Sequence, residues 1–295
     1  MRALGVNTWV WTSPLTGADL EVIAPRVAAW GFDVIELPVE DVGDWDPGRA
    51  RDLVSGLGLE PRVVLVMGPG RELVATDPGT RGRTQDYLRR VVDAAAAVGS
   101  PVAAGPAYAS VGRTWRISPA ERASLVAELT EALAPVVEHA AQAGVRLAVE
   151  PLNRYETSVL NTVDQGLELL ADLPSEHCGL ALDVYHMNIE EQDVPAAVLR
   201  AGDRVAHVQV CANDRGAPGA DHLDWSGIVD ALDTIRYRGP LVIESFTAEN
   251  ATIATAASIW RPLAATQDAI AVDGLAFLRS LDRTDRNARE GAAVD

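Results

Sequence analysis

The chain has 295 residues, of which 48% are hydrophobic, enough to bury the core of one large barrel or of two smaller domains. Its formal net charge is -17, and such an acidic surface repels nucleic-acid phosphates and anionic lipids, so we expect no nucleic-acid and no membrane partner. The sequence contains no lysine, which excludes Schiff-base catalysis by a lysine amine and a phosphate-binding loop of the Walker A type.

The N-terminal segment and the cysteines indicate a cytoplasmic protein without disulfides. The first residues enter a strand pattern at once and lack the small-residue cleavage site of a signal peptide, and no stretch reaches the length of a membrane span. Cys178 precedes one predicted strand and Cys211 follows the end of the next. Since these positions lie at opposite edges of a parallel sheet, we predict two free thiols.

Short apolar runs recur along the chain, as expected of strands that are buried on both faces. They predict eight strands, at residues 3–8, 33–37, 62–67, 101–105, 145–150, 179–183, 205–211 and 240–245. Stretches of helical periodicity lie between them, at residues 20–30, 84–98, 118–143, 162–173, 195–201 and 225–235. The third of these helices opens with a capping box, Ser118 to Glu121, and ends near Gly144.

The alternation of strands and helices predicts an α/β fold with a parallel sheet, and eight such units are the number in a single closed (β/α)8 barrel, the TIM barrel. An open doubly wound sheet is the alternative. It calls for a Gly-x-Gly-x-x-Gly segment after a strand, which the sequence lacks. No linker divides the chain. We therefore predict one barrel domain over residues 1–281, followed by a polar C-terminal tail over residues 282–295.

Four successive strands in the second half of the chain each end on a residue with an oxygen that can bind a hard cation. These residues are Glu150, Asp183, Gln209 and Glu244. In a barrel the carboxyl ends of the strands open on one face, so the four side chains are expected to converge there. Three clustered carboxylates repel one another unless a cation or a proton lies between them. The pattern predicts a divalent metal site; helix capping or pairing with arginines is the alternative for each residue taken alone.

The donor types indicate which metal would bind. With Gln209 the site offers only oxygen atoms, which suit Mn²⁺ and Mg²⁺, whereas an imidazole ligand would favour later transition metals. We therefore expect Mn²⁺ or Mg²⁺ as the cofactor, with Co²⁺ as a third candidate.

The segments around these residues resemble the motifs of a known family, the D-tagatose and D-allulose (psicose) 3-epimerases. The matching segments are Glu150-Pro-Leu-Asn-Arg-Tyr-Glu-Thr157, Leu182-Asp-Val-Tyr-His-Met-Asn-Ile-Glu-Glu191, Asn213-Asp-Arg-Gly-Ala-Pro-Gly219 and Val242-Ile-Glu-Ser-Phe246. The resemblance extends from Gly5 to about Leu278 and is most specific from Glu150 onward. That family belongs to the xylose-isomerase-like barrels.

The resemblance implies an activity and a role for each site residue. It implies a ketose 3-epimerase that takes a free sugar, with Glu150, Asp183, Glu244 and position 209 as metal ligands. It also implies that Glu156, His186 and Arg215 contact the substrate, with His186 in the loop after the sixth strand. Glu150 and Glu244, on strands separated by two others, can flank a substrate from opposite faces. One glutamate would remove the C3 proton and the other would return it, through an enediolate.

One departure from the family keeps other activities open. The epimerases usually have histidine where this chain has Gln209, and His207-Val-Gln209 resembles the His-x-Gln strand of hydroxypyruvate isomerases. A hydroxypyruvate-type aldose–ketose isomerase is therefore the first alternative. The second is a metal nuclease of the endonuclease IV type, which the net charge disfavours. A homo-oligomer is compatible with the sequence.

Several other residues near the predicted barrel mouth have no assigned role. The sequence predicts His207 as a core histidine one layer below Gln209. Asn7, Trp9 and Glu36 lie in or just after the first two strands. For these residues the sequence leaves two roles open, packing in the core and contact with a ligand at the barrel mouth.

Overall fold

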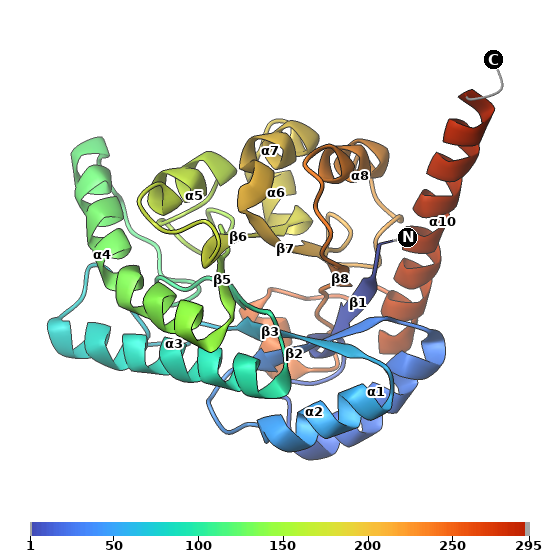
Figure 1. Cartoon of the computed structure of the whole chain (residues 1–295), viewed down its shortest axis with the longest axis horizontal. Coiled ribbons are helices and arrows are strands. Elements are labelled where there is room, and N and C mark those ends of the chain that lie inside the picture. Colours follow the sequence, from blue (N-terminus) through green and yellow to red (C-terminus); the bar gives the residue numbers. More distant parts are fainter. Residues whose placement is uncertain (1, 293–295) are drawn as a thin grey trace.

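The computed structural model describes residues 2–292, with the backbone alone at positions 252 and 282–292. Within these residues eight parallel strands form a closed barrel in chain order, and the last strand pairs with the first (Figure 1). The strands are β1 (Leu4–Asn7), β2 (Val34–Val39), β3 (Glu60–Leu65), β4 (Val102–Gly105), β5 (Arg146–Val149), β6 (Cys178–Asp183), β7 (Val205–Val210) and β8 (Leu241–Ile243). The predicted (β/α)8 barrel is confirmed.

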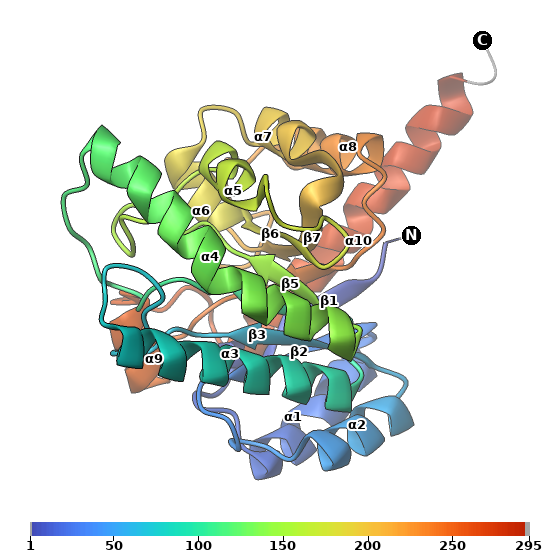
Figure 2. The same ribbon diagram turned by 60° about the vertical axis from the view of Figure 1, so that its left-hand side comes forward.

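Helices lie between the strands and cover the outside of the barrel; α3 and α4 run along one side of it (Figure 2). The α-helices are α1 (Gly17–Trp30), α2 (Pro47–Gly56), α3 (Pro78–Val98), α4 (Pro119–Ala143), α5 (Val163–Leu170), α6 (Val184–Glu190), α7 (Val194–Ala201), α8 (Trp225–Thr234), α9 (Ala251–Ala256) and α10 (Gln267–Ala292). The two short 3-10 helices are η1 (Thr8–Val10) and η2 (Gly202–Arg204).

Alternation along each strand explains how the sequence builds two layers. On β5, Leu147 and Val149 belong to the large apolar core between the strands and the helices. Ala148 belongs to a separate small cluster with alanines of β4 and β6. Successive side chains of a strand point to opposite faces, so Ala148 lies on the inward face and Glu150, two residues later, continues it.

Most predicted elements are confirmed, and the differences have local causes. All eight strands and the six predicted helices are present with ends shifted by a few residues, and Ser118 and Glu121 form the predicted capping box of α4. The sequence did not predict α2, α6, α9 or α10. The predicted loop position of His186 is wrong, because α6 begins directly after β6: the side chain of Asp183 accepts a hydrogen bond from the backbone N–H of Tyr185 and caps the helix.

Three further features bear on the sequence predictions. Cys178 and Cys211 are free and buried, as predicted. Helix α10 continues to Ala292, through most of the segment predicted as a polar tail, while residues 293–295 lie outside the described part of the chain. Among the described residues, no helix combines the length and the apolar composition that crossing a bilayer requires.

Gly105 shows how the barrel backbone holds the site, and it yields a stability prediction. It ends β4 with a φ of +137°, a Cβ added there would lie 2.5 Å from the carbonyl oxygen of Leu65, and its own carbonyl accepts a hydrogen bond from the backbone N–H of Glu150 at 3.0 Å. We expect Gly105→Ala to lower the free energy of unfolding by about 1–3 kcal/mol, the usual cost of a strained backbone. Urea denaturation followed by circular dichroism measures this.

The matched control is Gly82→Ala in α3, where an added Cβ meets no atom within 4 Å. Alanine in a helix interior is favoured over glycine, so this variant should gain roughly 0.5–1 kcal/mol. Equal stability of the two variants would show that the backbone at position 105 relaxes freely.

Candidate active site

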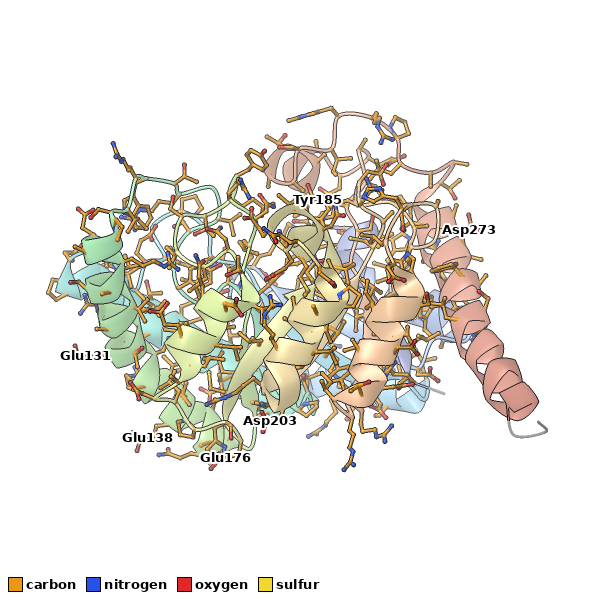
Figure 3. The ribbon with its side chains drawn as sticks, turned by 90° about the horizontal axis from the view of Figure 1, so that it is seen from above. Glu131, Glu138, Glu176, Tyr185, Asp203 and Asp273 are labelled. Atoms are coloured by element: carbon orange, nitrogen blue, oxygen red, sulfur yellow. The ribbon has the colours of Figure 1, made fainter. Side chains whose placement is uncertain are left out.

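The predicted site residues gather at one end of the barrel, at the carboxyl ends of the strands. Tyr185, which follows β6, lies at this end near the top of Figure 3, whereas Glu176 and Asp203, which precede strands, lie at the opposite edge. Active sites of (β/α)8 barrels are built at the carboxyl ends. Six predicted site residues are buried: Glu150, Asp183, His186, Gln209, Arg215 and Glu244. The seventh, Glu156, is half-buried.

Asp183 has two tasks at the end of β6. Its Oδ1 accepts a hydrogen bond from the backbone N–H of Tyr185 at 2.9 Å, which starts α6. Its Oδ2 accepts one from Nη1 of Arg215 at 2.5 Å. Because the cap fixes one oxygen, the other is held toward the centre of the site.

Arg215 brings a buried positive charge between the carboxylates of two strands. Its Nη1 donates to Asp183 Oδ2 at 2.5 Å and to Glu244 Oε2 at 2.8 Å, and its guanidinium lies over the rings of Tyr185 and Phe246. The site thus contains three carboxyl groups, those of Glu150, Asp183 and Glu244, and the positive charge of one arginine.

The backbone of Arg215 is in an uncommon conformation. Its φ is +71°, in the left-handed region that non-glycine residues seldom adopt. Two hydrogen bonds stabilise it: the backbone N–H donates to the carbonyl of Ala212 at 3.0 Å, and Ser245 Oγ donates to the carbonyl of Arg215 at 2.5 Å. The strain is concentrated at the residue whose side chain enters the site, as is common at functional positions.

Both ring nitrogens of His186 face hydrogen-bond donors. The backbone N–H of Asn153 points at Nδ1 at 3.1 Å, and Nη2 of Arg215, which can only donate, lies 3.1 Å from Nε2. Nε2 lies 3.5 Å from Glu150 Oε1 and 3.6 Å from Asp183 Oδ2. Burial lowers the pKa of His186, which favours the neutral ring. Asn153 also donates to Glu156 Oε1 at 2.8 Å and so links the two predicted substrate contacts.

Side chains of the site lie close enough together to hold a metal ion. One atom each of Glu150, Asp183 and His186 lies within 4.8 Å of the others, a spacing that can hold a cation. Nε2 of His186, however, lies 3.1 Å from Nη2 of Arg215, a cationic group that can only donate, so it is poorly placed to bind a metal. Gln209 is the better fourth donor: it is fully buried, and its Oε1 has no hydrogen-bond partner among the described residues.

The electrostatics of the site favour an added cation or proton. Burial raises the pKa of Glu150 well above its ordinary value, and the charges of Glu244 and Asp183 raise it further, while Arg215 opposes the shift. Burial likewise raises the pKa of Glu244, against the opposing effect of Arg215. Carboxyl groups with raised pKa values are suited to accept and return protons near neutral pH.

A cavity of about 220 Å³ opens above these groups. Its polar side is formed by Glu150, Glu156, His186, Arg215 and Glu244. The rest of the lining is largely apolar, with contributions from Trp9, Val66, Phe246, Ile253 and Ala257. This volume lies below the roughly 300–1,000 Å³ of pockets for drug-sized ligands, so the cavity suits a small molecule.

The sequence did not assign a second set of polar residues at the site. Glu36 of β2 is fully buried and contacts Asn7, His207 and Gln209. Glu40, at the edge of the cavity, accepts hydrogen bonds from Trp9 Nε1 at 2.9 Å and Ser13 Oγ at 2.5 Å. A glutamate on the inward face of an otherwise apolar run, Val34–Val39, is the signal that could have indicated Glu36.

Comparison with known proteins places this barrel in a family. The chain matches the family described as xylose isomerase-like TIM barrel over residues 24–281. It is similar to a probable ketose 3-epimerase from Synechocystis sp., with 35% identity over 95% of this chain and 96% of that protein.

Solved structures agree with this assignment. An L-ribulose 3-epimerase superposes with a TM-score of 0.91 at 30% identity, over 99% of this chain and 98% of that one. A D-allulose 3-epimerase from Methylomonas sp., solved in complex with D-allulose, superposes with a TM-score of 0.85 at 30% identity, over 95% of this chain and 98% of that one. The chain therefore belongs to the xylose isomerase-like TIM barrel family, and within that family it is similar to the ketose 3-epimerases.

Proposed function

We propose that the protein is a divalent-metal-dependent ketose 3-epimerase that acts on a free ketopentose or ketohexose. The observation that carries this proposal is the pair of buried glutamates, Glu150 and Glu244, which follow β5 and β8 and line one cavity with raised pKa values. Relatives named ketose, L-ribulose and D-psicose 3-epimerase support it.

The two glutamates can move a proton between the faces of a substrate carbon. Inversion at C3 beside the carbonyl needs a base on one face and an acid on the other, with an enediolate between the two steps. Glu150 and Glu244 lie on strands separated by β6 and β7, so they approach the cavity from different directions. One would take the C3 proton and the other would return a proton to the opposite face.

Glu150, Asp183, Gln209 and Glu244 would hold the metal, which when bound would polarise the substrate carbonyl and orient its neighbouring hydroxyl. All four residues offer oxygen, which favours Mn²⁺ or Mg²⁺, with Co²⁺ as a third candidate.

The remaining polar residues would position the sugar. His186 lines the cavity and would form a hydrogen bond with a substrate oxygen. Glu156 and Arg215 also line the cavity and would bind hydroxyl groups, while Trp9 and Phe246 cover apolar parts of the sugar.

The charges around the cavity argue against the alternative substrates. Among the described residues that line it, Arg215 is the single arginine, while Glu40, Glu150, Glu156 and Glu244 are acidic. These acidic side chains disfavour the carboxylate of hydroxypyruvate and the phosphates of DNA, although the bound cation would offset part of the repulsion. A neutral sugar meets no such repulsion. Gln209 is the feature that favours the hydroxypyruvate isomerase alternative.

The test is hydrogen exchange in heavy water with a panel of ketoses, including D-allulose, D-tagatose and L-ribulose, and Mn²⁺ present. We expect deuterium at C3, detected by NMR, together with formation of the C3 epimer. Exchange confined to C1 or C2, or turnover of hydroxypyruvate alone, would assign the isomerase activity. Cleavage of abasic DNA without sugar turnover would assign the nuclease.

A further inference from the structure

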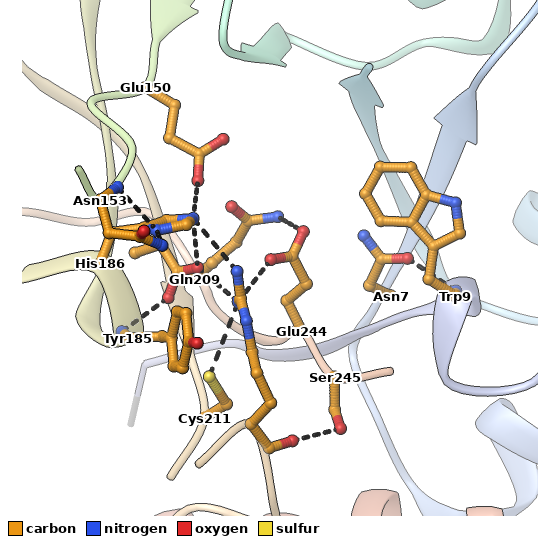
Figure 4. A network of polar contacts seen from close by, with 12 residues as sticks. Asn7, Trp9, Glu150, Asn153, Tyr185, His186, Gln209, Cys211, Glu244 and Ser245 are labelled. Atoms are coloured by element: carbon orange, nitrogen blue, oxygen red, sulfur yellow. Dashed lines mark hydrogen bonds and ion pairs between the residues drawn. The ribbon is translucent and has the colours of Figure 1, made fainter. Parts of the chain in front are cut away.

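The carboxamide of Gln209 is held in one orientation by two carboxylates. Its Nε2 donates to Glu244 Oε1 at 2.7 Å and to Glu36 Oε2 at 2.9 Å, whereas its Oε1 has no partner among the described residues (Figure 4 shows the bond to Glu244). In both bonds the amide nitrogen donates and a carboxyl oxygen accepts, so the nitrogen and not the oxygen faces these two groups. The oxygen is thereby turned away from both of them.

The direction of this network is set by the backbone of β1 and η1. The backbone N–H of Trp9 donates to Asn7 Oδ1 at 2.8 Å, so the amide nitrogen of Asn7 points the other way and donates to Glu36 Oε2 at 2.7 Å. His207 Nε2 lies 2.6 Å from Glu36 Oε1, a short contact without the geometry of an aligned hydrogen bond. Nitrogen atoms of three side chains therefore surround one fully buried carboxylate.

We propose that Glu36 is a positioning residue for the metal: it accepts from the amide of Gln209 and so keeps Gln209 Oε1 directed at the cation site. This inference rests on the metal site of the proposed function. Glu36 does not line the cavity, so in this arrangement it acts through Gln209 and does not bind the metal itself.

A glutamine ligand needs such a partner because its carboxamide has two ends. The terminal torsion of glutamine is broad and roughly two-fold, so the amide can turn by about 180° and present its N–H groups where the oxygen was. N–H groups repel a cation. A carboxylate on the nitrogen side removes that second orientation, as outer partners do for other metal ligands.

The experiment is a double-mutant cycle on Mn²⁺ affinity, measured by calorimetry with MnCl2 added to chelator-treated protein. Glu36→Leu should weaken binding by roughly 10–100-fold, the usual effect of losing an outer partner, and Gln209→Ala, which removes the ligand itself, should weaken it at least as much. The double variant should bind about as weakly as the weaker single variant, because Glu36 acts through Gln209. The inference would be overturned if the double variant lost the product of the two single-variant fold-losses in Mn²⁺ affinity. It would also be overturned if Glu36→Leu bound Mn²⁺ as tightly as the wild type. Absence of Mn²⁺ binding by the wild type would instead refute the proposed metal site.

Two further variants separate positioning from general stability. Glu72 is also a buried glutamate, bonded to Ser110 and Arg113 and outside the cavity lining. Glu72→Leu should lower the unfolding free energy in chelator but leave Mn²⁺ affinity unchanged. If Glu36→Leu does not fold, Glu36→Gln keeps the packing and weakens the acceptor. It should then show a smaller loss of affinity that disappears in the Gln209→Ala background; a loss that persists there contradicts the inference.

Discussion

Glu150→Gln and Glu244→Gln are each expected to lower kcat for C3 epimerisation by roughly 10²–10⁴-fold, because each removes one of the two groups that exchange protons with the substrate. Glutamine keeps the size and the buried packing of glutamate, but its neutral amide cannot accept a proton near neutral pH. Initial rates with a ketose in the presence of saturating Mn²⁺, together with circular dichroism to verify the fold, measure the effect.

Exchange of the C3 proton distinguishes the two glutamates from ordinary ligands. Glu150 and Glu244 are expected to exchange protons with opposite faces of C3. Each single variant should therefore reduce exchange of the C3 proton more strongly when one epimer is the substrate than when the other is. Glu138→Gln, an exposed position on α4, is the control and should retain full activity. Near wild-type turnover by either Glu150→Gln or Glu244→Gln would contradict the two-glutamate mechanism.

The sequence predicted the convergence of the site because it depends on regularities of a parallel barrel. Strand ends at Glu150, Asp183, Gln209 and Glu244 could be read from apolar runs, and in a barrel such ends share one face. The alternation along a strand also placed His207 below Gln209 on the inward side. These inferences need periodicity alone and no knowledge of contacts.

The network under the site could not be predicted in the same way. Gln209 meets Glu36 only because β8 pairs back with β1 and closes the sheet, which brings two residues 173 positions apart into hydrogen-bond contact. Periodicity gives the face on which a side chain lies, but it does not give its partner.

The local backbone conformations at the barrel mouth could not be predicted from the hydrophobic pattern either. Helix α6 has seven residues, too few to show a helical period, so His186 could not be distinguished from a loop histidine. Arg215 was predicted as a substrate contact, but its left-handed backbone and its insertion between Asp183 and Glu244 depend on the turn formed by Ala212–Gly216 and on Ser245.

Removal of the Arg215 guanidinium should destabilise the metal-free protein strongly. Arg215→Met keeps an apolar stem against Tyr185 and Phe246 but leaves Asp183 and Glu244 buried without their cation. Breaking a buried ion pair from one side costs about 3–5 kcal/mol. Thermal and urea unfolding at pH 8 in chelator should show this loss. In contrast, Arg89→Met, which breaks an i,i+3 pair with Asp86 on α3, should cost about 0.5 kcal/mol or less.

The pH dependence of that loss tests its electrostatic origin. The folded-state pKa values of Glu150 and Glu244 are raised, so each glutamate stabilises the fold by binding a proton at low pH and loses this contribution as the pH rises through its folded-state pKa. Arg215 lowers both pKa values, so its removal raises them further, and the deficit of Arg215→Met should shrink as the pH falls from 8 toward 5. At one fixed Mn²⁺ concentration, the ion should stabilise Arg215→Met more than the wild type at pH 8, because it replaces the lost cation; a ligand at about 100 times its Kd contributes roughly 2.7 kcal/mol. A deficit that does not change with pH and is not reduced by Mn²⁺ would show that Arg215 contributes packing and not charge.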